Sequence, residues 1–119
     1  MFVSHTDDVD RSPVAMEGAR GVLKQILIGP GEGWDNHVMR QFILEASGNT
    51  PRHSHPWPHI NYITSGEGVL YLDGEEHRLT VGSIAYVPGN TEHQFINRSN
   101  DDFSFLCIVP LDGEASYAK

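Results

Sequence analysis

The chain has 119 residues, of which 39% are hydrophobic, and its 8 basic and 16 acidic side chains give a net charge of −8 at pH 7. This length fits one domain with a single core. The acidic balance argues against nucleic acid and anionic membrane surfaces as partners, because no block of basic residues is present to neutralise phosphates.

Cysteine content and apolar runs narrow the expected cellular setting. Cys107 is the only cysteine, so an intrachain disulfide is impossible, and a reducing, cytoplasmic location is the simplest expectation. Residues 1–20 lack a basic start followed by an apolar core, which is the pattern of a secretory signal. The longest apolar runs are too short to span a bilayer.

Turn residues divide most of the chain into short β-type segments. Residues 1–21 are polar and are expected to form an N-terminal arm with little regular structure, followed by one barrel domain over residues 22–119. The expected strands are residues 22–28, 37–45, 60–64, 68–72, 76–79, 84–87, 93–97 and 103–109, with residues 46–52 as a connection. Asp73-Gly74 is a strong hairpin signal, because both residues tolerate positive φ. No segment keeps a helical period over ten residues, so the pattern predicts an all-β antiparallel sandwich or barrel.

A cluster of histidines is the most informative feature of the sequence. His53, His55 and His59 fall within seven residues, and His93 can supply a fourth imidazole. Imidazole is the commonest protein ligand for transition metals at neutral pH. Because residues two apart share one face of a strand, His53 and His55 can chelate one ion. A proline-rich turn can then bring His59 back towards it.

Two spaced patterns surround these histidines. The first contains Gly48, His53, His55, His59 and Gly66, and the second contains Gly82, Pro88, Asn90, His93 and Asn97. Together they resemble the two motifs of the cupin superfamily, over residues 48–97. The resemblance implies a double-stranded β-helix, which is a jelly-roll barrel, with a metal ion inside it towards one mouth. It implies His53, His55, His59 and His93 as the metal ligands.

The third ligand departs from the usual superfamily pattern, because His59 stands where most cupins have glutamate. In this respect the chain resembles small single-domain bacterial cupins with four histidines, of the manganese-binding kind. The resemblance implies a divalent transition metal, manganese or iron first, with zinc, nickel or copper as alternatives. An octahedral ion with four protein ligands keeps two positions for dioxygen, peroxide or a chelating substrate. A tetrahedral zinc ion would be closed by the same four groups and would look structural.

Three further residues are candidates for the wall of a substrate pocket. Arg40 lies in an apolar strand, and it either points outward into solvent or points inward to orient an anionic substrate. Phe95 is two residues past His93 and should share its face, although core packing explains it equally well. Cys107 is a candidate for the same wall, but a small buried hydrophobic role is the commoner one for such a cysteine.

The sequence supports two functions of different classes. The first is a metal-dependent oxidoreductase or dioxygenase that acts on a small organic molecule. The second is a non-catalytic binding or sensing module in which the metal anchors a small ligand. A metal-assisted isomerase or lyase is disfavoured, because no motif places a carboxylate base beside the metal. We also expect a homodimer, because the arm and the first strand would otherwise leave an exposed sheet edge.

Overall fold

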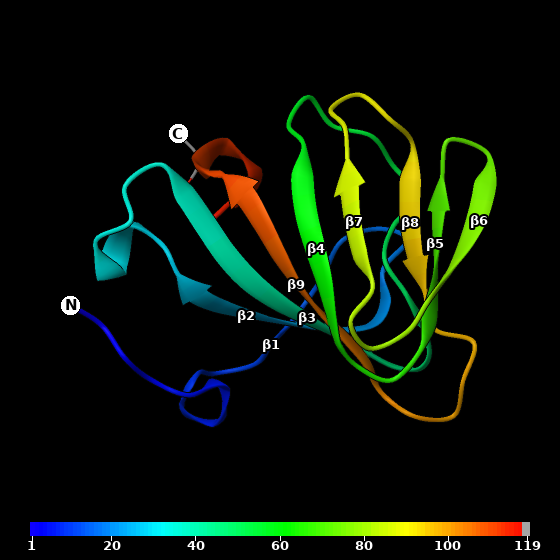
Figure 1. Ribbon diagram of the computed structural model, residues 1–119, viewed down its shortest axis with the longest axis horizontal. Helices are drawn as coiled ribbons and strands as arrows, with labels where there is room; N and C mark the ends of the chain where they lie inside the picture. The colour runs from blue at the N-terminus through cyan, green and yellow to red at the C-terminus, as the bar shows by residue number, and fades with distance from the viewer. Residues whose placement is uncertain (118–119) are drawn as a thin grey trace.

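The computed structural model describes residues 1–117 and is built almost entirely of strands (Figure 1). The strands are β1 (Ser12–Pro13), β2 (Arg20–Ile28), β3 (His37–Asn49), β4 (His59–Ser65), β5 (Gly68–Leu72), β6 (Glu75–Leu79), β7 (Ile84–Val87), β8 (His93–Ile96) and β9 (Phe103–Pro110). Three short 3-10 turns, η1 (Thr6–Asp8), η2 (Pro30–Glu32) and η3 (Leu111–Gly113), complete the elements. Within residues 1–117, no helix has the length and apolarity needed to cross a membrane.

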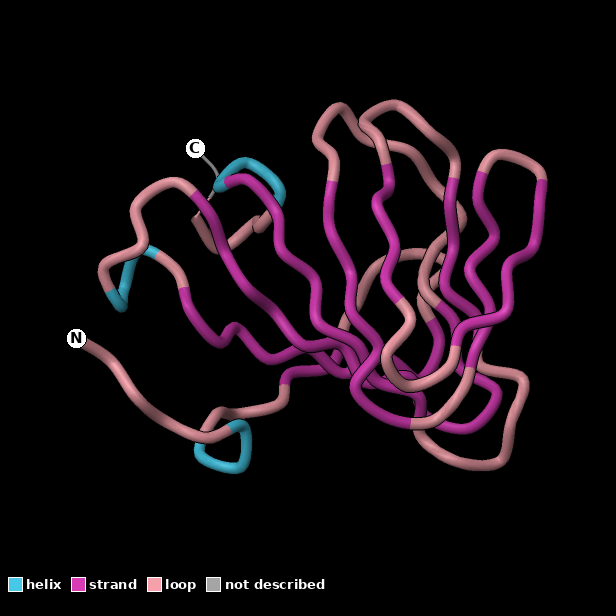
Figure 2. The backbone as a smooth tube through the Cα atoms, viewed as in Figure 1, coloured by secondary structure: helices cyan, strands magenta, loops and turns pink. Residues whose placement is uncertain are grey.

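The strands form one antiparallel sheet that curls on itself (Figure 2). Its order is β6-β5-β8-β3-β9-β4-β7; in addition, β2 pairs with β3 over residues 39–49, and β1 pairs with β2. Each neighbouring pair is antiparallel, from the β5–β6 hairpin at Asp73-Gly74 to the long β3–β9 ladder. The all-β jelly-roll barrel expected from the sequence is therefore confirmed.

Strand β3 is longer than the sequence predicted. The expected strand ended at residue 45 and residues 46–52 were expected to be a connection, but β3 continues to Asn49. Ser47 has a φ of 64°, and a Cβ atom on Gly48 would lie 2.8 Å from the carbonyl oxygen of Arg20. Glycine and a left-handed residue thus let the strand bend instead of ending. Beyond the bend, Asn49 pairs with Ile96 of β8, which joins β5, β6 and β8 to the rest of the sheet.

The arm is also more ordered than the sequence predicted. Ser12 and Pro13 pair with Lys24 and Leu23 of β2, and the buried side chain of Gln25 donates hydrogen bonds to two arm carbonyls at 2.8 and 2.9 Å. The arm therefore covers the edge of β2, and the open edge from which a dimer was expected is paired within the chain. The boundary between residues 1–21 and 22–119 stays a prediction.

Side chains that face into the barrel change character along the β3–β9 pair. Leu44 lies opposite Phe103 and Phe42 lies opposite Phe105, so this end is apolar. The core cluster comprises Val22, Leu44, Ile63, Leu70, Leu79, Val87, Phe95, Phe103 and Phe105. Two residues further along, Arg40 lies opposite Cys107, and the interior becomes polar. A second, smaller apolar cluster of Val38, Cys107 and Val109 follows, so the polar part of the interior lies between two apolar clusters.

Candidate metal centre

The four histidines come from two strands and the loop between β3 and β4. His59 begins β4 and His93 begins β8. His53 forms an isolated bridge with His93, with N–H···O distances of 2.9 and 3.2 Å. The amide of Asn90 donates to the carbonyl of His55. These backbone hydrogen bonds fix the loop to the start of β8, so the histidine positions are set by the sheet.

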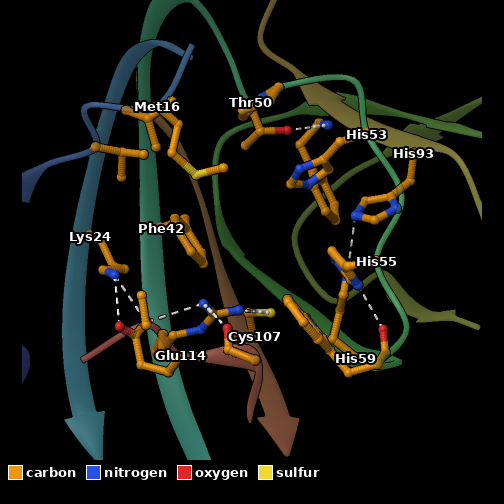
Figure 3. A pocket seen from close by; sticks show the side chains of 18 of the residues that line it. Met16, Lys24, Phe42, Thr50, His53, His55, His59, His93, Cys107 and Glu114 are labelled. Carbon is orange, nitrogen blue, oxygen red and sulfur yellow. Dashed lines mark hydrogen bonds and ion pairs between the residues drawn. The ribbon is translucent and has the colours of Figure 1, made fainter. Parts of the chain in front are cut away.

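The imidazole rings gather around His93. Its ring centroid lies 5.0 Å from that of His53, 4.8 Å from that of His55 and 4.9 Å from that of His59. His53, His55 and His93 each offer a nitrogen within 4.8 Å of the other two. His59 joins them through its Nε2, which lies 3.2 Å from Nε2 of His93. The structure therefore brings together all four residues that the sequence singled out (Figure 3).

Hydrogen bonds at Nδ1 set the orientation of three of these rings. Nδ1 of His55 lies 2.7 Å from the carbonyl of Trp57, and Nδ1 of His93 lies 2.8 Å from that of Thr91. Nδ1 of His59 lies 2.6 Å from Oδ1 of Asn61. Since the backbone carbonyls accept only, and the amide nitrogen of Asn61 donates elsewhere to the carbonyl of Leu106, each Nδ1 carries the hydrogen. The unprotonated Nε2 atoms are then left for a ligand role.

The close approach of His59 and His93 fits a metal ion. Their two Nε2 lone pairs face each other at 3.2 Å with no hydrogen between them, which is unfavourable unless a cation lies nearby. Two nitrogens about 2.1 Å from one ion and about 90° apart would lie about 3.0 Å from each other. The donor set therefore suits a divalent transition metal.

Burial keeps the imidazoles in the neutral form that a metal requires. It lowers the pKa of all four from the ordinary value of 6.5. The pKa values of His55 and His59 fall to about 4, although the hydrogen bonds to Trp57 and Asn61 oppose the shift. Mutual repulsion among the rings adds to the lowering at His53, His55 and His93.

Trp57 fixes the outer side of the cluster. Its ring stacks on that of His55 at a centroid distance of 4.5 Å and an interplanar angle of 8°. On the other side it meets Gly113, where a Cβ atom would lie 2.9 Å from the indole. The segment after β9 and the histidine loop are thus in contact through one aromatic side chain.

A cavity of about 480 Å³ lies next to the histidines. All three pocket candidates from the sequence line it: Arg40, Phe95 and Cys107. Arg40 is 9% exposed and points inward, so of its two possible orientations the solvated one is wrong. Phe95 also belongs to the core cluster, so both of its expected roles hold. Met16, in the segment that was expected to be an arm, contributes to the wall.

Sequence reasoning missed two charged residues in this cavity. Lys24 of β2 and Glu114, which follows η3, both line it, and Lys24 Nζ lies 2.9 and 3.0 Å from the two carboxylate oxygens. Figure 3 shows them across the pocket from the histidines. Glu114 lies at the opposite end of the cavity from the histidines (Figure 3), so it does not contradict the expectation that no carboxylate base lies beside the metal. Glu114 lies in a polar stretch near the chain end, and no motif or periodicity distinguishes it from a solvated residue.

The Glu114 side chain is fully buried, yet its surroundings favour the ionised form. Burial by itself would raise its pKa, but the hydrogen bonds from Lys24 and from the Ser116 amide, with the charges of Lys24 and Arg40, lower the pKa to about 2. A carboxylate held this way is a weak base. Its presence therefore does not restore the isomerase or lyase hypothesis.

Comparison with known proteins places the chain in a family. The cupin domain family matches residues 40–109, which is more than half of the chain. The polyketide cyclase RemF from Streptomyces resistomycificus is 28% identical, with a TM-score of 0.87 over 92% of this chain and 79% of that one.

Two further solved structures share the fold. A predicted oxalate decarboxylase from Thermotoga maritima is 21% identical, with a TM-score of 0.82 over 92% of this chain and 98% of that one. A sugar phosphate isomerase of the cupin superfamily from Silicibacter pomeroyi is 24% identical, with a TM-score of 0.74 over 89% and 73%. No curated protein sequence matches the chain. With its matched barrel and its cluster of histidines at one end, the chain belongs to the cupin family.

Proposed function

We propose that this cupin is a metal-dependent oxidoreductase or dioxygenase that acts on a small organic molecule. A divalent ion would be held by His53, His55, His59 and His93, as in four-histidine cupins of the manganese type. The observation that carries the proposal is the convergence of these imidazoles, in which three Nδ1 atoms have acceptors and two Nε2 atoms meet at 3.2 Å.

The metal ion would supply the chemistry, and the protein would determine which substrate binds. Manganese or iron at this site would supply redox chemistry and would polarise a substrate oxygen. The chain excludes water with the buried rings of Phe95 and Phe105, and the cavity volume is that of an ordinary small-molecule site. Three of the four rings are fixed at Nδ1, so little reorganisation is needed when an ion binds.

Metal analysis followed by an oxygen assay tests the proposal. Protein purified without chelator should contain about one redox-active ion per chain and should take up oxygen when a panel of small organic acids and phenols is supplied. The matched control is His77→Ala, since His77 is exposed on β6 and outside the cluster. One tightly held zinc ion without exchangeable water would instead favour a non-catalytic binding or sensing module. A protein that cannot be loaded with any metal would refute both functions.

The similarity to a polyketide cyclase supports a second candidate, a metal-assisted cyclisation. RemF is 28% identical over 92% of this chain, and the cavity has aromatic walls formed by Phe42, Phe95 and Phe105. The same assay separates the two candidates. A cyclase would convert a substrate under nitrogen as fast as in air, whereas a dioxygenase would stop.

A homodimer stays part of the proposal, on a different surface from the one first expected. Ile60 and Tyr62 of β4 pair with Tyr86 and Ile84 of β7, and all four side chains are exposed on the outer face of the sheet. On a chain of net charge −8, this uncharged apolar patch is where two copies repel each other least. Light scattering should give the mass of a dimer at micromolar concentration, and Tyr86→Glu should give a monomer. A wild-type monomer would refute this assignment.

A further inference from the structure

The end of the cavity opposite the histidines is lined by a buried charge cluster. Lys24 Nζ contacts both carboxylate oxygens of Glu114, and Nη1 of Arg40 lies 3.2 Å from Oε1 of the same group. Glu114 is 0% exposed and Arg40 is 9% exposed. Lys24 comes from β2, Arg40 from β3 and Glu114 from the segment after β9, so two strands and that segment meet here (Figure 3).

The charges in this cluster do not cancel. Lys24 and Arg40 are cations, and Glu114 is the single buried carboxylate that faces them. Asp112 also lines the cavity, but it is exposed at the rim. A surplus of one positive charge in a cavity with phenylalanine walls is costly unless an anion accompanies it. The site is therefore electrostatically suited to a second, external anion.

Arg40 has unused hydrogen-bonding capacity in the same place. Nη1 donates to Glu114 and, at 3.3 Å, to the carbonyl of Gly113. Nη2 donates at 3.1 Å to the sulfur of Cys107, and a thiol sulfur is a weak acceptor. Nε is buried and has no partner among the described residues. The Nε–Nη2 edge, which usually binds a carboxylate with two parallel hydrogen bonds, thus meets no oxygen.

We infer that Arg40 and Lys24 form an anion subsite that binds the carboxylate of a small organic acid, whose apolar part lies along Phe42, Phe95 and Phe105 towards the histidines. Because Nε is covered by protein atoms, the guanidinium turns when the acid binds, and it exchanges the weak Cys107 contact for two oxygen contacts. Nη1 of Arg40 keeps its hydrogen bond to Glu114 during this change. As a statement about the substrate, the inference rests on the proposed function, but anion binding itself does not require the metal.

The dimensions of the cavity agree with this assignment. Its volume of about 480 Å³ extends from the histidines to Glu114, which is room for a molecule larger than the carboxylate alone. The ring of Phe42 lies 4.9 Å from the guanidinium carbon of Arg40, and Phe95 and Phe105 stack at 4.1 Å. A ring that carries a carboxylate can therefore contact the guanidinium and the aromatic wall at once.

Binding of benzoate and of benzamide tests the inference, because the two probes have nearly the same shape and differ in charge. Both are titrated calorimetrically into the full chain, once loaded with metal and once after removal of metal by a chelator. We expect benzoate to bind at least about tenfold more tightly than benzamide in both forms, as for a charge-assisted hydrogen-bonded pair. A preference that appears only with metal would mean that the carboxylate binds the ion, and it would overturn the inference.

Two variants and one control locate the effect. Arg40→Met should abolish the preference for benzoate. Glu114→Gln keeps the shape of the side chain but removes the competing negative charge, so the affinity for benzoate should rise by about tenfold. Arg98→Met, which removes an exposed arginine paired with Glu76, should change neither affinity. If Arg40→Met does not fold, Glu114→Gln decides, and an unchanged or lower benzoate affinity in that variant overturns the inference.

The design separates this inference from the proposed function. A chain that binds benzoate through Arg40 but takes up no metal would refute the enzyme and leave the anion subsite standing. A chain that holds one redox-active ion but does not distinguish benzoate from benzamide would refute the subsite alone.

Discussion

The two ends of the cavity make opposite electrostatic demands. At one end, four imidazoles are kept neutral by burial, and their nitrogens are directed at one another. At the other end, Lys24, Arg40 and Glu114 are all charged and satisfy one another in part. The first arrangement would be completed by a cation, and the second contains one carboxylate for two cations. Apolar rings and the thiol of Cys107 separate them.

The two ends are therefore suited to external groups of opposite charge. The histidine end contains no charge of its own, so the proposed metal ion would be the only charge there. At the charged end, Glu114 offsets part of the cost of removing water from Lys24 and Arg40, and one positive charge is left for an external anion. The following predictions test whether the two ends behave as differently as their chemistry requires.

Glu114→Ala should give the largest loss of stability. It leaves the buried Arg40 and the partly buried Lys24 without a counter-ion, and breaking a buried ion pair by removing one partner costs about 3–5 kcal/mol. Urea denaturation of the metal-free protein measures the free energy of unfolding. Glu76→Ala is the matched control, since its ion pair with Arg98 is exposed and such pairs contribute less than about 1 kcal/mol. Equal effects of the two substitutions would show that the Glu114 cluster is not a buried ion pair in solution.

The two ends should lose stability in different ranges of pH. The pKa values of His55 and His59 are about 4 in the folded chain and 6.5 ordinarily, so the unfolded state binds more protons between these values. Stability of the metal-free protein therefore falls as pH drops from 6.5 to 4. The pKa of Glu114 is lowered from 4.5 to about 2, so its contribution is present above pH 4.5 and is lost as pH drops towards 2.

Acid unfolding of variants assigns each range. In His59→Ala the loss between pH 6.5 and 4 should be smaller, and in Glu114→Gln the loss below pH 4.5 should be smaller. Thermal melting followed by circular dichroism at half-unit steps of pH gives both profiles. If either variant changes the other range instead, the assignment of the groups is wrong.

His59→Ala should abolish most metal binding and leave the barrel folded. It removes one of four ligands, so the loss should exceed the about 10- to 100-fold that a supporting residue typically contributes. Metal affinity is measured by competition with a chromophoric chelator, and folding by circular dichroism. His77→Ala should bind metal as the wild type does. Unchanged affinity in His59→Ala would exclude His59 as a ligand.

The sequence predicted the histidine end far better than the charged end, for a physical reason. His53, His55 and His59 are close in the chain, and strand periodicity with a proline-rich turn brings them together locally. His93 was found because its motif has fixed spacing. Glu114, in contrast, reaches the cavity only because the chain folds back after β9, and a contact across 90 residues with Lys24 leaves no local pattern.

In the fold, too, local features were predicted from the sequence and long-range ones were missed. Alternation and turn residues predicted most strands within one or two residues, and Asp73-Gly74 predicted its hairpin. The extension of β3 was missed, because Ser47 and Gly48 read as a turn. They bend a strand here, since Asn49 finds a partner in β8 that no local pattern shows. The sequence left the direction of Arg40 open. Whether this arginine points inward depends on its contact with the carboxylate of Glu114, which is distant in the sequence.

Among the candidate metal ligands, His59 differs from His55 and His93 in what orients its ring. His55 and His93 are oriented by backbone carbonyls, which substitution cannot remove, whereas His59 is oriented by the side chain of Asn61. Asn61→Ala should therefore weaken metal binding by about 10- to 100-fold, less than His59→Ala, because the ligand remains but its ring is free to turn. Asn61→Asp provides a stronger acceptor and should retain affinity or raise it. Since the amide of Asn61 also donates to Leu106 at 3.2 Å, both variants need a stability measurement. Equal metal affinities in Asn61→Ala and Asn61→Asp would mean that packing alone orients His59.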